Sequence, residues 1–138
     1  MDGGIWTVEN RRQRNYRKII AWERAHALTL RIYSATQEFP KHELYGLTSQ
    51  IRRSAFSVGA NIAEGSGRAG PKEFLRFLHI ALGSAKETEY ALLVARDVGY
   101  LNEALFTELT NLTNATIAPL QGLIKAVSAE ANSTINSP

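Results

Sequence analysis

Apolar side chains recur along the chain at alternating intervals of three and four residues, the period of one face of an α-helix. The first stripe predicts a helix from about residue 21 to Glu38 or Phe39, because Pro40 pushes the preceding residue out of helical geometry. The second predicts a helix from about residue 44 to Gly65, with Gly65 as a left-handed cap. The stripes consist of Ala21, Ala25, Leu28, Ile32, Ala35 and Phe39, then Leu44, Leu47, Ile51, Ala55, Val58 and Ile62.

Two further stripes follow a turn that contains Gly70 and Pro71. Gly70 suits the N-cap and Pro71 the first helical turn of a third helix, which ends at Gly99. Asn102 is a suitable N-cap for a fourth helix. Pro119 removes a backbone donor, so we expect a kink at residues 115–119. The stripes consist of Phe74, Leu78, Ala81 or Leu82, Ala85 and Leu92, then Leu105, Leu109, Leu112, Leu120, Leu123 and Val127.

Four amphipathic stripes with short connections, and no sustained strand-type alternation, predict an all-α fold, an antiparallel up-down four-helix bundle. We expect the bundle at residues 19–128, a flexible basic arm at 1–18 and a disordered tail at 129–138. The chain has 138 residues, no cysteine and no apolar run that could span a membrane. Its first ten residues lack the apolar region of a signal peptide, so we expect a cytoplasmic protein.

Positive charge is concentrated in the first half of the chain. Residues 1–76 carry 13 Lys and Arg against 7 Asp and Glu, whereas residues 77–138 carry 3 against 6. Such a basic region is either solvated or in contact with a polyanion. The candidate phosphate-binding residues are Arg11, Arg12, Arg14, Arg17, Lys18, Arg24, Arg31, Arg52, Arg53, Arg68 and Lys72. The alternative is that the helix arginines form ordinary surface ion pairs, with Glu23, Glu38 or Glu64.

Residues 65–70 spell G-x-G-x-x-G, the pattern of dinucleotide-binding loops. That motif works where a strand turns into a helix, whereas here it follows a helix and no sheet is predicted. Helix capping explains the glycines. A weaker possibility is an anion site at the start of the third helix, flanked by Arg68 and Lys72.

Residues for catalysis or metal binding are missing from the pattern. His26, His42 and His79 lack metal-ligand spacing and there is no cysteine, so we expect no metal and no cofactor. No serine lies in a nucleophile elbow, so we expect no enzymatic activity. We also find no aromatic stacking platform, which predicts recognition of charge and shape rather than of bases.

One acidic residue, Glu89, falls on the apolar row of the third helix. A carboxylate at a packed seam needs partners, so we predict a polar network that fixes how helices or subunits fit together. Its members are Ser54, Asn61, Glu64 and Glu89.

Several strings of the sequence have a family resemblance. They are residues 39–55 (FPKHELYGLTSQIRRSA), 61–68 (NIAEGSGR) and 72–78 (KEFLRFL), with Gly83-Ser84, Glu87, Glu89 and Gly99-Tyr100-Leu101. From about Ile19 to Val127, the chain resembles the four-helix bundle family of 23S rRNA intervening-sequence proteins. It departs from many members at residues 58–60, which contain no proline.

The resemblance implies a bacterial cytoplasmic bundle that assembles as a ring-shaped homo-oligomer, a pentamer. The chain is also similar to the accessory variability determinant of diversity-generating retroelements, which implies RNA, DNA or a reverse transcriptase as possible partners. We therefore expect a non-enzymatic adaptor that binds nucleic acid. The alternative is a scaffold that binds a partner protein, such as a reverse transcriptase, without touching nucleic acid.

Overall fold

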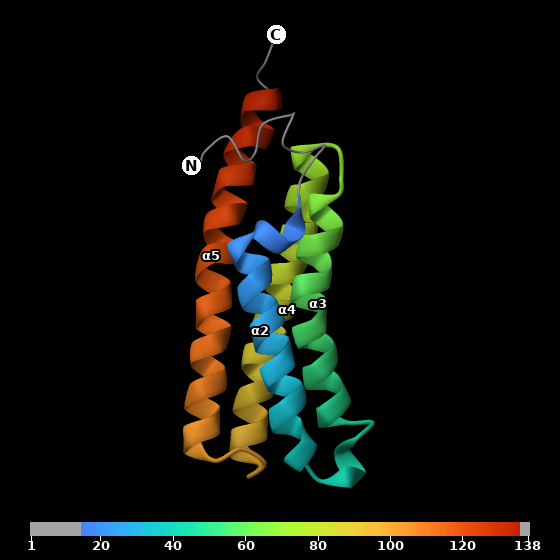
Figure 1. Cartoon of the computed structure of the whole chain (residues 1–138), viewed down its shortest axis with the longest axis vertical. Helices are drawn as coiled ribbons and strands as arrows, with labels where there is room; N and C mark the ends of the chain where they lie inside the picture. The colour runs from blue at the N-terminus through green and yellow to red at the C-terminus, as the bar shows by residue number, and fades with distance from the viewer. Residues whose placement is uncertain (1–14, 136–138) are drawn as a thin grey trace.

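A computed structural model describes residues 15–135 as an all-helical protein without strands. The four long helices are α2 (Ile20–Ala35), α3 (Leu47–Ser66), α4 (Pro71–Asp97) and α5 (Glu103–Ile135), as Figure 1 shows. Short 3₁₀ turns η2 (Tyr16–Lys18), η3 (Thr36–Glu38) and η4 (Lys41–Glu43) lie before α3. The predicted all-α class with four helices is confirmed.

The four long helices lie side by side, and each packs against two others. Helices α2 and α4 both contact α3 and α5, and the contact between α3 and α4 is the most extensive (Figure 1). Two apolar clusters fill the interior, one around Phe74 and Leu120, the other around Ile51 and Leu92. Burying such side chains supplies the main drive for folding.

The predicted stripe of α2 is confirmed at all six positions, which are buried. The stripe of α3 is wrong at its first position, because Leu44 is exposed and Thr48 is buried instead. The reason is local: α3 begins only at Leu47, whose N–H donates to the Glu43 carboxylate at 3.1 Å. Leu44 therefore lies outside the helix that the stripe assumed.

The glycines at the helix ends have different roles. Gly99, with a φ of 90°, ends α4 as predicted, because a left-handed residue lets the next N–H groups reach back to the last carbonyls. Gly65 is not a left-handed cap. It lies inside α3, where a Cβ would stand 2.6 Å from the Cβ of Phe77, so glycine is required there by packing. Gly70 and Pro71 begin α4 as predicted.

Helix α5 is longer than its sequence predicts. The side chain of Asn102 caps it as expected, accepting from the N–H of Leu105 at 2.8 Å. The helix then runs unbroken through Pro119 to Ile135, and Ala131 is buried. The expected disordered tail is therefore wrong for residues 129–135, and residues 136–138 lie outside the described part. Thr113 and Thr116 are buried because their hydroxyls donate to carbonyls one turn back.

Hydroxyl groups form a belt where the two apolar clusters meet, between α3 and α4. Thr88 bonds Ser54 at 2.9 Å, Ser84 donates to Ser57 at 2.8 Å, and Asn61 donates to Ser57 at 2.9 Å. Ser54 and Asn61 of the predicted network thus belong to this hydroxyl belt. The hydroxyls of this belt are tolerated in the interior because each has a hydrogen-bond partner.

The two carboxylates of the predicted network lie elsewhere. Glu89 is not at the packed seam: its side chain is 44% exposed and pairs with Lys86. Thr88, one position earlier, occupies the interior row instead. Glu64 is exposed and pairs with Arg68, in the turn just after its helix. The expectation of a buried acidic network is therefore wrong.

Candidate nucleic-acid interface

The predicted basic arm is only partly described. Arg11, Arg12 and Arg14 lie outside the described residues. Arg17 and Lys18 are exposed and belong to the turn η2, which Asn15 caps by accepting the N–H of Arg17 at 3.0 Å. Residues 16–18 of the predicted arm therefore form a capped turn next to the buried Ile19.

Two predicted phosphate-binding arginines are engaged within the protein. Arg31 on α2 makes two bonds to Glu108 on α5, at 2.6 and 3.0 Å. The pair raises the pKa of Arg31 and lowers the pKa of Glu108. Arg68 pairs with Glu64 at 2.7 Å and lies over the ring of Phe77. Both arginines thus form the ordinary ion pairs of the alternative prediction, Arg68 with the expected Glu64 and Arg31 with Glu108.

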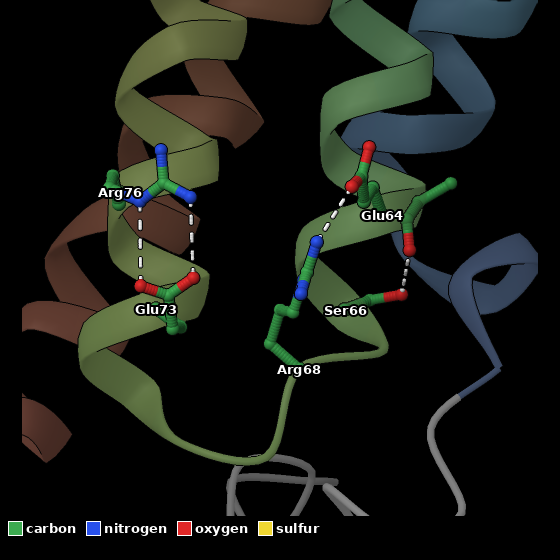
Figure 2. A network of polar contacts seen from close by, with 6 residues as sticks. Glu64, Ser66, Arg68, Glu73 and Arg76 are labelled. Atoms are coloured by element: carbon green, nitrogen blue, oxygen red, sulfur yellow. Dashed lines mark hydrogen bonds and ion pairs between the residues drawn. The ribbon is translucent and has the colours of Figure 1, made fainter.

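The turn between α3 and α4 keeps its charges in separate pairs. Figure 2 shows Arg68 pointing at Glu64 and Arg76 pointing at Glu73, each within its own segment. Ser66 donates to the carbonyl of Ala63 at 2.7 Å, which helps to close the end of α3 (Figure 2). Glu64 neutralises Arg68. Of the two cations predicted to flank the start of α4, Lys72 alone makes no ion pair with a described residue.

Arg52 and Arg53 lie together in a hollow between α2 and α3. The hollow has a volume of about 530 Å³ and its lining contains no carboxylate. Arg52 is held in place, because its Nε donates to the Thr36 hydroxyl at 2.8 Å and its guanidinium lies 4.9 Å from the centre of the Tyr33 ring. Arg53 is exposed and makes no ion pair with any described residue. The lining residues are Tyr33, Leu44, Tyr45, Ser49, Arg52, Arg53 and Phe56.

A second hollow continues the same seam toward the other end of α3. Phe56 lines both hollows, and Gly59, Ala60 and Ala63 of α3 provide small side chains in the second. The aromatic residues here are Tyr16, Trp22 and His26, and the rings of Trp22 and His26 are stacked 4.9 Å apart. We call the two hollows together the α2–α3 groove.

The aromatic side chains of this groove are what the sequence reasoning missed. The absence of an aromatic platform was expected, yet Tyr33, Tyr45 and Phe56 are exposed around one hollow. A signal was present in the sequence. Phe56 follows Ala55 of the apolar stripe directly, so on a helix it must point about 100° away from the core face.

Arg24 is exposed on α2 and makes no ion pair with a described residue. No group of three His, Asp or Glu side chains in the described residues could hold a metal ion. None of the described helices is both long and apolar enough to cross a membrane.

Comparison with known proteins places the chain in a family. No curated protein matches it. The chain is similar to a crystal structure of a protein of unknown function from the S23 ribosomal protein family of Bacteroides thetaiotaomicron VPI-5482. The two are 26% identical with a TM-score of 0.72, and the match covers 77% of this chain and 99% of the other. The model of the 23S rRNA-intervening sequence protein family matches residues 17–122, and the chain therefore belongs to that family.

Proposed function

We propose that the protein is a non-enzymatic, cytoplasmic adaptor that binds nucleic acid through phosphate contacts. In this proposal up-down bundles assemble into a ring-shaped homo-oligomer, which brings several copies of the basic surface together. Phosphate contacts add up, since each neutralised phosphate releases counterions. The family name refers to an intervening sequence of 23S rRNA, which is consistent with RNA as the polyanion.

The observation that carries the proposal is the difference in charge pairing between α3 and α4. On α4, three of the four cations, Arg76, Lys86 and Arg96, each pair with a carboxylate one to three residues away, and Lys72 in the first turn is the exception. On α3, Arg52 and Arg53 stand side by side without an ion pair to any described residue, in a hollow whose lining includes no acid. Paired surface charges confer solubility at little energetic gain, whereas adjacent unpaired arginines attract an anion.

The test is the binding of a labelled rRNA fragment and a duplex DNA of equal length, measured by fluorescence anisotropy from 50 to 300 mM salt. We expect micromolar or tighter binding at 50 mM that weakens steeply with salt. Arg24→Gln with Arg53→Gln should reduce the salt slope by about one to two, while Arg76→Gln with Lys86→Gln, which removes paired cations, should leave it unchanged. A further variant replaces Arg11, Arg12, Arg14, Arg17 and Lys18 by Ser and reports on the arm.

The second candidate is a protein scaffold for a partner enzyme such as a reverse transcriptase. Exposed Tyr, Phe and Arg side chains are also enriched at protein interfaces, and the α2–α3 groove contains all three. No binding of either nucleic acid at 50 mM salt would reject the adaptor and favour this scaffold. The mass of the oligomer, measured alongside, tests the ring in either case.

A further inference from the structure

Exposed rings gather in the α2–α3 groove although nothing in the fold requires them there. Tyr33, Tyr45 and Phe56 are 43%, 93% and 60% exposed, and all three line the same hollow. Single exposed apolar side chains are ordinary on a protein surface, but a cluster of rings in one hollow indicates a binding surface. A ligand of this hollow must therefore cover the apolar faces of these rings.

The same hollow limits that ligand to one carrying negative charge. Arg52 is oriented by the Thr36 hydroxyl and the Tyr33 ring, so it loses little freedom on binding. Arg53 has no ion-pair partner among the described residues, and no carboxylate lines either hollow of the groove. An uncharged ligand would strip water from these guanidinium groups without replacing it, which is costly.

The length and floor of the groove suit a strand rather than a single small molecule. From Ser49 to Ala63 the helix α3 advances about 21 Å at 1.5 Å per residue. Beyond Phe56 the lining includes Ala60 and Ala63, whose small side chains let a flat ring approach the helix, whereas Gly59 is buried against Trp22. The stacked Trp22 and His26 rings, inclined by only 8°, offer a further planar surface.

We propose that the α2–α3 groove binds a stretch of single-stranded RNA, with bases stacked on the exposed rings and phosphates on Arg52 and Arg53. Alternating stacking surfaces and cations are how proteins hold single strands without reading their sequence. Duplex bases are paired and stacked on one another, so their faces cannot reach the rings. The hydroxyl of Ser49, which lines the hollow, is the group that contacts a ribose 2′-hydroxyl. This inference rests on the proposed function and narrows it to one ligand and one site.

The test compares labelled U15, dT15 and a 15-base-pair RNA duplex, with the full-length protein and two variants. Tyr45→Ser with Phe56→Ser removes two exposed rings from the groove. Tyr90→Ser is the matched control, because Tyr90 is 67% exposed on α4 and lines neither hollow of the groove. All three side chains are exposed, so the variants should keep the melting temperature of the parent. Melting and oligomer mass are measured for each.

We expect U15 to bind more tightly than the duplex and than dT15, and to lose at least about tenfold in affinity in the double variant but not in Tyr90→Ser. Unchanged U15 binding in the double variant, or a preference for the duplex, would overturn the groove as a single-strand site. Equal binding of U15 and dT15 would overturn the choice of RNA. A changed oligomer mass in the double variant would instead identify the groove as a contact between copies.

Failure of this inference differs from failure of the proposed function. If the duplex binds with a steep salt dependence and the double variant binds everything as the parent does, the adaptor stands and the groove is rejected. If no nucleic acid binds at 50 mM salt, both are rejected.

Discussion

Helix α3 has two seams, and they are filled in opposite ways. Toward α4 it presents Ser54, Ser57 and Gly65, and the seam is closed by hydroxyl pairs and by the ring of Phe77. Toward α2 it presents Phe56 and Gly59, and the seam opens into the α2–α3 groove. A Cβ on Gly65 would clash at 2.6 Å, whereas one on Gly59 would meet Trp22 at an ordinary 3.6 Å.

The comparison shows that a small residue on a helix has two distinct uses. At Gly65 it admits a neighbouring side chain into the core, so its absence of a side chain contributes to stability. Gly59 is also buried, but a Cβ there would meet Trp22 and Ala25 at ordinary distances of 3.6 and 3.8 Å, so the same absence costs helix stability without a packing gain. The closed seam holds the fold and the open seam is available for binding. Substitutions at Gly65, Gly59 and Thr88 separate these two roles.

The largest effect is expected from Gly65→Ala in the closed seam. The added methyl overlaps Phe77 Cβ and touches a Phe74 ring atom at 3.0 Å, so the two helices must separate locally. We expect a loss of about 1–3 kcal/mol in the free energy of unfolding, measured by chemical denaturation.

Gly59→Ala in the open seam is the matched control for this substitution. It should be neutral or stabilising by up to about 1 kcal/mol, because alanine favours the helix and finds ordinary contacts. Equal destabilisation by both substitutions would show that the open seam is as tightly packed in solution as the closed one.

A smaller effect is expected from Thr88→Val in the hydroxyl belt. Valine keeps the shape of threonine but cannot bond Ser54, which retains its bond to the carbonyl of Ile51. We expect a loss of about 1 kcal/mol in denaturant unfolding, the net worth of one buried hydrogen bond. Thr107→Val on the exposed side of α5 should change stability by less than about 0.5 kcal/mol. A stabilised Thr88→Val would mean that the belt contributes nothing to holding the closed seam.

The smallest effect concerns pH and the start of α3. Glu43 has a pKa below its ordinary value, because its carboxylate accepts from the N–H of Leu47 and from the hydroxyl of Tyr100. The stabilisation from this carboxylate is therefore full above the unfolded-state pKa of about 4.3 and is lost as the pH falls through the lower folded-state value. Glu43→Gln should flatten the fall of the melting temperature in this acid range. An unchanged acid profile in Glu43→Gln would show that the carboxylate does not anchor the helix start.

Most of the fold was predictable because its determinants are local. The period of α2, the left-handed Gly99 and the Asn102 cap are each set by a few neighbouring residues. The error at Glu89 has a physical cause, since threonine counts as polar in a pattern yet is buried once its hydroxyl bonds a carbonyl one turn back, as Thr88, Thr113 and Thr116 do. That rule moves the interior row of α4 from Glu89 to Thr88.

The candidate site was less predictable because it depends on how helices meet. The pairing of Arg31 with Glu108 joins residues 77 positions apart, which no local pattern shows. The exposure of Tyr33 and Tyr45 depends on the space left between α2 and the turn before α3. By contrast the Glu64 and Arg68 pair joins residues only four positions apart, and Glu64 was visible as a partner in the sequence.

The Arg31 and Glu108 pair also bears on the order in which the bundle forms. Three of the helix contacts join neighbours along the chain, so they form early at little entropic cost. These are the contacts of α2 with α3, of α3 with α4 and of α4 with α5. Only the contact between α2 and α5 requires the two ends of the bundle to meet, and loop closure makes such a contact late. An ion pair made after the rate-limiting step slows unfolding without speeding folding. Arg31 and Glu108 therefore add modestly to how long a folded molecule lasts rather than to how quickly it is made.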